Sequence, residues 1–171
     1  MSGPAGRALS EAAARLGVAL RDRGWFLATA ESSTGGLIGH ALTTNPGASD
    51  YYAGGVICYS NLAKEVGLGV PHALIAEQGA VSESVAVALA RGAADRFEAE
   101  LAISVTGIAG PDGGSLAKPV GTHFIAAVSG SRVPRVEKHR FSFDRNGNRA
   151  AAALRALEMA LDEVLATPVA D

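Results

Sequence analysis

The sequence lacks the residues that disulfide bonds and zinc sites require. Cys58 is the only cysteine among 171 residues, so no disulfide can form within the chain. No cluster of cysteine and histidine has the spacing of a zinc site. This pattern excludes a disulfide-stabilised secreted domain and indicates a reducing compartment.

Long apolar runs and a surplus of one charge are also absent. The longest apolar stretches are far shorter than the ~20 residues that a membrane-spanning helix needs, and the N-terminus lacks the charged-then-apolar order of a signal peptide. With 15 basic and 17 acidic side chains, the formal net charge is -2. This charge gives no reason to expect nucleic acid or a membrane surface as a partner. We therefore predict a cytoplasmic protein.

The residues that are present predict one globular domain, 1–171, with a hydrophobic fraction of 48%. Apolar residues at helical spacing predict helices over 7–23, 34–43, 60–67, 82–97 and 148–166. Apolar runs of strand length predict strands over 25–30, 54–59, 101–105 and 120–128, and a segment of alternating side chains predicts a strand with one wet side over 133–143. Helical and strand segments alternate up to the strand 101–105, after which two more strands follow directly and a helix closes the chain. This order predicts a three-layer α/β/α sandwich with a mixed, mostly parallel sheet of about five strands, one of them antiparallel.

Three polar segments follow apolar strands. They are Glu31–Gly36, Tyr59–Asn61 with Lys64 one turn later, and Thr106–Gly114. Ligands of open α/β sheets bind beyond the carboxyl ends of parallel strands. If the strands are parallel neighbours, the three segments meet at one edge, and this convergence predicts a site better than any single motif does.

The first segment places three hydroxyl groups, from Ser32, Ser33 and Thr34, ahead of an expected helix. A serine or threonine in this place usually caps the helix, although three exceed what one cap needs. The free amides of a helix start also suit an oxyanion or a phosphate. A serine there could attack a carbonyl carbon while backbone N–H groups hold the developing negative charge. Both interpretations stay open.

A nucleophilic serine needs a group that accepts its proton. None of the four histidines is placed by the sequence next to the polar segments, so a Ser-His-Asp triad has weak support. Lys64 is the alternative base, because burial would lower its pKa and Tyr59 could relay or orient the proton. Spacing alone favours the other interpretation of Lys64, an ordinary solvated helix residue.

The segment Gly107–Gly114 lacks the lysine of a P-loop and the helix that follows a dinucleotide fingerprint. It belongs to a glycine- and proline-rich stretch over 107–119 that excludes regular structure. Such a length favours a functional loop over a simple connection. Its backbone could wrap an anion as a nest of N–H groups.

Five blocks of the sequence resemble the CinA C-terminal family, whose enzymes are nicotinamide-nucleotide amidases. The blocks are Ala30–Gly36, Gly54–Val70, Gly79–Glu83, Ser104–Thr122 and Phe143–Arg149. They cover nearly the whole chain in the order of the family, and the block Ser104–Thr122 is highly specific. Larger CinA proteins carry an additional N-terminal domain for which 171 residues leave no room, so we expect the stand-alone form.

The resemblance implies hydrolysis of the carboxamide of nicotinamide mononucleotide, which gives nicotinate mononucleotide and ammonia. Carried over by position, Ser32 is the nucleophile, and Tyr59 and Lys64 activate it. The phosphate would lie on main-chain amides of the 107–114 loop or of the helix start at Gly35, with Arg145 or Arg149. The expected substrate-binding residues are Ser33, Thr34, Gly35, Gly36, Thr106, Gly107, Gly110, Asp112, Gly113, Arg145 and Arg149.

This chemistry requires neither a metal nor an organic cofactor, and Asp112 alone would bind a cation only weakly. The expected partner is a small-molecule pyridine nucleotide, without nucleic acid or membrane. The habit of the family implies a homo-oligomer, with the strand 133–143 or the terminal helix as candidate contacts. The main alternative is a catalytically silent nucleotide-binding or protein-interaction module of the same fold. Hydrolysis of another amide or ester is a third possibility.

Overall fold

A single mixed sheet forms the centre of the computed structural model, which describes residues 3–167. Its strands are β1 (Leu27–Glu31), β2 (Tyr52–Ile57), β3 (Leu101–Gly107), β4 (Thr122–Ser129) and β5 (Arg135–Arg140), in the order β2-β1-β3-β4-β5. β1 pairs in parallel with β2 and β3, whereas β4 is antiparallel to both of its neighbours. The predicted five-stranded sheet with one antiparallel strand is confirmed.

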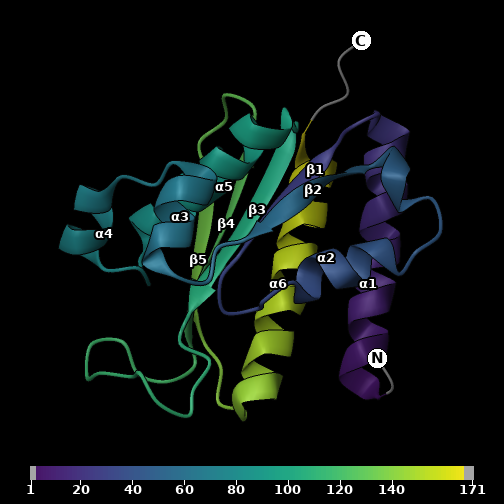
Figure 1. Ribbon diagram of the computed structural model, residues 1–171. Helices are drawn as coiled ribbons and strands as arrows, with labels where there is room; N and C mark the ends of the chain where they lie inside the picture. Colours follow the sequence, from purple (N-terminus) through teal and green to yellow (C-terminus); the bar gives the residue numbers. More distant parts are fainter. Residues whose placement is uncertain (1–2, 168–171) are drawn as a thin grey trace.

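Helices cover both faces of the sheet (Figure 1). The first layer contains α1 (Pro4–Arg23), α2 (Leu37–Thr43) and α6 (Arg145–Ala166). The second contains α3 (Asn61–Leu68), α4 (His72–Gln78) and α5 (Glu83–Phe97), and a short 3-10 helix, η1, spans Ala48–Asp50. The three-layer α/β/α sandwich is thus confirmed. Neither α4 nor η1 was predicted, because segments of seven and three residues are too short to show a helical period.

Three helix starts differ from the predicted ones by three residues, and one of them is α1, which begins at Pro4 and not at residue 7. α2 begins at Leu37, three residues after the predicted start. α6 begins three residues before its predicted start, because Asp144 caps it by accepting a hydrogen bond from the Gly147 amide at 2.7 Å. The first turn of α6 is polar, so the apolar period that predicts the helix is visible only from residue 148 onward.

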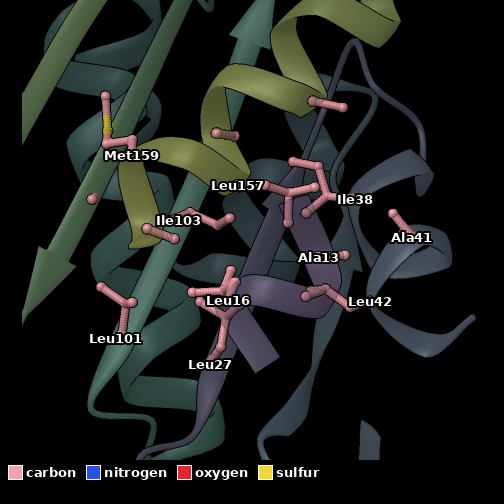
Figure 2. Close-up of a cluster of buried hydrophobic side chains, with 14 of the residues drawn as sticks. Ala13, Leu16, Leu27, Ile38, Ala41, Leu42, Leu101, Ile103, Leu157 and Met159 are labelled. Carbon is pink, nitrogen blue, oxygen red and sulfur yellow. The ribbon is translucent and has the colours of Figure 1, made fainter. Parts of the chain in front are cut away.

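Apolar side chains fill the space on each face of the sheet. Between the sheet and the layer of α1, α2 and α6, fully buried side chains include Leu16, Leu27, Ile103 and Leu157 (Figure 2). On the other face, Leu89 of α5 packs in a second cluster with alanines of β1 and β3. Because β1 and β3 are buried on both faces, they appear in the sequence as continuous apolar runs.

The register of the sheet brings three strand ends to one edge. Glu31, the last residue of β1, pairs with Ile57 at the end of β2 and with Val105 near the end of β3. The segments that follow these strands therefore start side by side. Within residues 3–167, no helix combines the length and the apolar character that crossing a membrane would require.

Candidate active site

A cavity of about 260 Å³ lies where the segments after β1, β2 and β3 meet. Ten predicted site residues line it: Ser32, Ser33, Tyr59, Lys64, Thr106, Gly107, Gly110, Asp112, Gly113 and Arg145. Four others are not part of its wall: Thr34, Gly35, Gly36 and Arg149. A larger groove of about 980 Å³ beside α3, α4 and α5 contains no predicted site residue, so volume alone does not identify the site.

The cavity wall also contains residues that the sequence did not single out as site residues: Asn61, Ala80, Val81, Ile108 and Ala109. Asn61 stands between Tyr59 and Lys64, so its place in the second polar segment was the available signal. Ala80 and Val81 precede α5 and are apolar, and only their position in a family block could have indicated them.

Lys64 extends from the first turn of α3 to Ser32 at the end of β1. Its Nζ atom lies 3.1 Å from Ser32 Oγ, 2.8 Å from the Cys58 carbonyl oxygen and 3.3 Å from the Tyr59 carbonyl oxygen. Ser60 caps α3 by accepting a hydrogen bond from the Ala63 amide, which fixes the start of the helix. Lys64 is only 2% exposed. It is therefore not a solvated helix residue.

Burial shifts the ionisation of Lys64 toward its neutral form. Burial lowers the pKa of the amine, because a charged group loses hydration there, while Cys58 and Tyr59 act in the opposite direction. A neutral amine has two N–H bonds and one lone pair. With both N–H groups donated to the carbonyls of Cys58 and Tyr59, the lone pair can accept the proton of the Ser32 hydroxyl. This geometry fits a general base.

Tyr59 contacts Lys64 through its main chain, which differs from the predicted proton relay. Its side chain is 62% exposed, and its hydroxyl accepts a hydrogen bond from Arg145 Nη2 at 3.0 Å. The second terminal nitrogen of Arg145 donates to the Gly110 carbonyl at 2.6 Å. Arg145 thereby joins the segment after β2 to the loop after β3.

Glu31 is a buried residue of the site that the sequence analysis did not select. Its carboxylate accepts hydrogen bonds from the amides of Gly36 at 2.9 Å, Ile38 at 3.1 Å and Gly39 at 2.8 Å. These amides belong to the start of α2, so the helix start already holds a carboxylate. The predicted phosphate position at the start of this helix is therefore occupied by the protein itself. An acidic residue directly after an apolar strand was the signal in the sequence.

The hydroxyls of Ser32, Ser33 and Thr34 do not cap α2, since its N-cap residue is Gly36 and the amides of its start donate to Glu31. The capping interpretation of this segment is wrong, because α2 begins too late for these side chains. Ser33 Oγ and Thr34 Oγ1 are buried and have no hydrogen-bond partner among the described residues. The backbone amides of the same two residues also find no acceptor within 3–167. The segment thus presents unused donors next to Ser32.

The start of α6 contacts the loops after β1 and β3. Arg149 donates from Nε to the Ser33 carbonyl at 3.2 Å and from Nη2 to the Thr34 carbonyl at 2.8 Å. Asn148 is fully buried and donates to the Ala109 carbonyl at 3.0 Å. Asn148 was not predicted as a site residue, and its contact partner lies 39 positions away in the chain. No pattern in the sequence indicates such a contact.

Gly107, at the end of β3, leaves space for the ring of His123. A Cβ atom at this position would lie 2.2 Å from His123 Cδ2. His123 is fully buried and lies behind the cavity wall, and no histidine among residues 3–167 lines the cavity. The described residues therefore form no Ser-His-Asp triad at Ser32. They also contain no cluster of three or more His, Cys, Asp or Glu residues arranged to hold a metal ion.

Comparisons with known proteins find relatives over most of the chain. A CinA-like protein of Syntrophobacter fumaroxidans is 51% identical over 142 residues, which cover 83% of this chain and 33% of that protein. The chain thus spans about one third of the length of the CinA-like relatives that it matches. A protein of Enterobacter agglomerans named nicotinamide-nucleotide amidohydrolase PncC is 42% identical over 157 residues, covering 92% and 96% of the two chains.

A solved structure has the same fold. The crystal structure of competence/damage inducible protein CihA from Agrobacterium tumefaciens matches with a TM-score of 0.87 and 39% identity, over 91% of this chain and 96% of that chain. The family model described as the CinA C-terminal domain matches residues 9–164. This chain therefore belongs to the CinA C-terminal domain family.

Proposed function

We propose that the protein is a nicotinamide-nucleotide amidohydrolase that converts nicotinamide mononucleotide and water to nicotinate mononucleotide and ammonia in pyridine nucleotide salvage. The observation that carries this proposal is the buried pair of Ser32 and Lys64, with Oγ and Nζ 3.1 Å apart in a cavity. The relative named for this activity, which aligns over almost its full length, supports the choice of substrate.

In the first half of the reaction, Ser32 Oγ attacks the carboxamide carbon while its proton moves to the neutral amine of Lys64. Negative charge then develops on the carbonyl oxygen. The unused backbone N–H groups of Ser33 and Thr34 lie directly after the nucleophile and can donate to this oxygen. The charge thus forms next to hydrogen-bond donors that are already in place.

The carbon–nitrogen bond breaks next. Lys64 returns the proton to the departing nitrogen, so that ammonia leaves and an ester of Ser32 remains. A water molecule then attacks this ester while Lys64 accepts one of its protons. The proton returns to Ser32 Oγ as the carbon–oxygen bond breaks, and nicotinate mononucleotide is released. Lys64 therefore ends the cycle neutral, as it began.

The exposed rim of the cavity would bind the part of the nucleotide that does not fit inside. A volume of about 260 Å³ is small for a small-molecule site, so we place the carboxamide and the ring inside and the ribose phosphate at the opening. The exposed ring of Tyr59 can lie against the positively charged pyridinium. The phosphate would bind to backbone amides of the Gly110–Gly113 loop, because the start of α2 is occupied by Glu31.

The test is ammonia release from nicotinamide mononucleotide by the purified full chain, with nicotinate mononucleotide identified by mass spectrometry. Ser32→Ala and Lys64→Met should each lose on the order of 10²–10⁴ in kcat. Lys138→Met is the matched control, because Lys138 lies on β5 with its amine over the Phe124 ring. Equal rates for Ser32→Ala and the wild-type protein would contradict the proposed nucleophile. A wild-type protein without ammonia release would contradict the proposed substrate.

A further inference from the structure

Arg149 holds two successive peptide groups of the segment that follows the proposed nucleophile. Its Nε donates to the Ser33 carbonyl at 3.2 Å and its Nη2 donates to the Thr34 carbonyl at 2.8 Å. A trans peptide is planar, so its C=O and N–H bonds point in opposite directions. Since the Ser33 carbonyl points toward Arg149, the N–H of Thr34, which belongs to the same peptide, must point away from it.

We propose that Arg149 is a positioning residue that orients the Ser33–Thr34 peptide so that its N–H group faces the carbonyl oxygen of the substrate during attack by Ser32. The inference rests on the proposed amidase function and assigns Arg149 a role in that reaction. Without Arg149 this peptide can rotate, and a donor that must already be in place at the moment of attack is lost. Donors of this kind act because they require no reorganisation in the transition state.

The contacts of Arg149 argue against the alternative role of a phosphate ligand. Its third nitrogen, Nη1, donates to Asn146 Oδ1 at 3.3 Å, so each of its three nitrogens already has an acceptor within the protein. A guanidinium bound to two main-chain carbonyls stabilises the backbone, and three of its five N–H groups are already used within the protein.

The helix that carries Arg149 is suited to this task. α6 has 22 residues, and its first turns are anchored by the Asp144 cap and by the buried Asn148 amide on the Ala109 carbonyl. A side chain on such a rigid helix can set a peptide plane more accurately than one on a loop. The buried hydroxyls of Ser33 and Thr34 lack partners among the described residues, so these two side chains do not anchor the segment.

The experiment compares Arg149→Met and Arg149→Lys with Arg23→Met as the matched control. Arg23 also donates to a main-chain carbonyl, that of Thr167, which lies just past the other end of α6. For Arg149→Met we expect kcat to fall by about 10²–10³ with KM little changed, because the lost contact acts in the transition state. Arg149→Lys can restore one carbonyl contact, so its kcat should lie between that of Arg149→Met and that of the wild-type protein. Arg23→Met should keep the kcat of the wild-type protein.

Two further readouts separate positioning from a general loss of structure. Guanidinium ion added to Arg149→Ala should restore part of kcat, which it would not do for a misfolded protein. The pH at which kcat/KM reaches half of its maximum should be the same in Arg149→Lys and in the wild-type protein, since Lys64 is untouched. A raised KM with unchanged kcat in Arg149→Met would overturn the inference and make Arg149 a substrate ligand.

A second reaction distinguishes failure of this inference from failure of the proposed function. A sulfonyl fluoride modifies an activated serine and also develops negative charge on oxygen, so its rate of reaction with Ser32 can be followed by mass spectrometry. This rate should fall in Arg149→Met even if nicotinamide mononucleotide is not the substrate. An equal labelling rate in Arg149→Met and the wild-type protein would overturn the positioning role whatever the substrate is.

Discussion

The pH dependence of hydrolysis tests the proposed role of Lys64 most directly. The base must be neutral, so kcat/KM should rise about tenfold per pH unit while Lys64 is protonated and become constant above its pKa. An unshifted lysine would be only about 0.1% neutral at pH 7.5. Each unit by which burial lowers the pKa raises that fraction about tenfold, so the depressed pKa of Lys64 moves the plateau toward neutral pH.

The assay is continuous ammonia detection at low substrate concentration between about pH 5.5 and about pH 9.5, a range that brackets the expected ionisation. Lys64→Arg retains the positive charge but stays protonated throughout, so it should lose on the order of 10²–10⁴ in rate. Cys58, beside Lys64, does not ionise in this range, because burial raises the pKa of its thiol to about 11. Cys58→Ala should therefore keep the rise of the rate with pH, which assigns this rise to Lys64 and not to the thiol.

Two results would refute this reasoning. Lys64→Arg with a rate close to that of the wild-type protein would mean that a positive charge suffices and that no base is needed there. A wild-type rate that does not change with pH over the whole range would mean that no ionisation controls the step. Circular dichroism at each pH shows whether the protein remains folded, which keeps these outcomes interpretable.

Three further predictions concern stability. Glu31→Gln should lower the free energy of unfolding, measured in urea titrations, by about 2–4 kcal/mol, because the neutral amide of glutamine cannot satisfy three backbone donors. A loss below about 0.5 kcal/mol would contradict this prediction. Gly107→Ala should lower the melting temperature, since the added Cβ would lie 2.2 Å from His123 Cδ2. Adding His123→Ala to this variant removes the clash and should restore part of the lost melting temperature. The hydrogen bonds from Arg155 hold the pKa of the Glu137 carboxyl well below its usual range. The stability that Glu137 contributes is therefore fully present above about pH 4.5, and it is lost as the pH falls through the pKa of the folded state. The difference in unfolding free energy between the wild-type protein and Glu137→Gln should accordingly narrow on acidification, and a difference independent of pH would contradict it.

The layers and the sheet could be predicted because their signals are local. α5 and α6 show apolar residues at helical spacing over several turns, and β1 and β3 appear as continuous apolar runs because both of their faces are buried. The alternation of these elements then restricts the topology. Helices of seven residues or fewer were placed less well, as α4 and the late start of α2 illustrate. Their positions depend on contacts with distant residues.

Glu31 shows why the site was harder to predict than the fold. Glu31 was not selected from the sequence as a site residue, yet its carboxylate accepts three amides at the start of α2. The three hydroxyls that seemed suited to cap this helix are thereby left free of that task. Only the path of the chain between residues 31 and 39 decides which side chain reaches the helix start, and the residue types alone do not fix this path.

The start of α6 connects all three segments of the site. Arg145 donates to Tyr59 and Gly110, and Arg149 donates to Ser33 and Thr34, so one helix start contacts the segments after β1, β2 and β3. These contacts join residues that are 35 to 116 positions apart in the chain. A sequence motif records only near neighbours, whereas the spacing of the proposed base, nucleophile and oxyanion donors depends on this remote helix. A substitution at the start of α6 should therefore alter catalysis even where it touches no atom of the substrate.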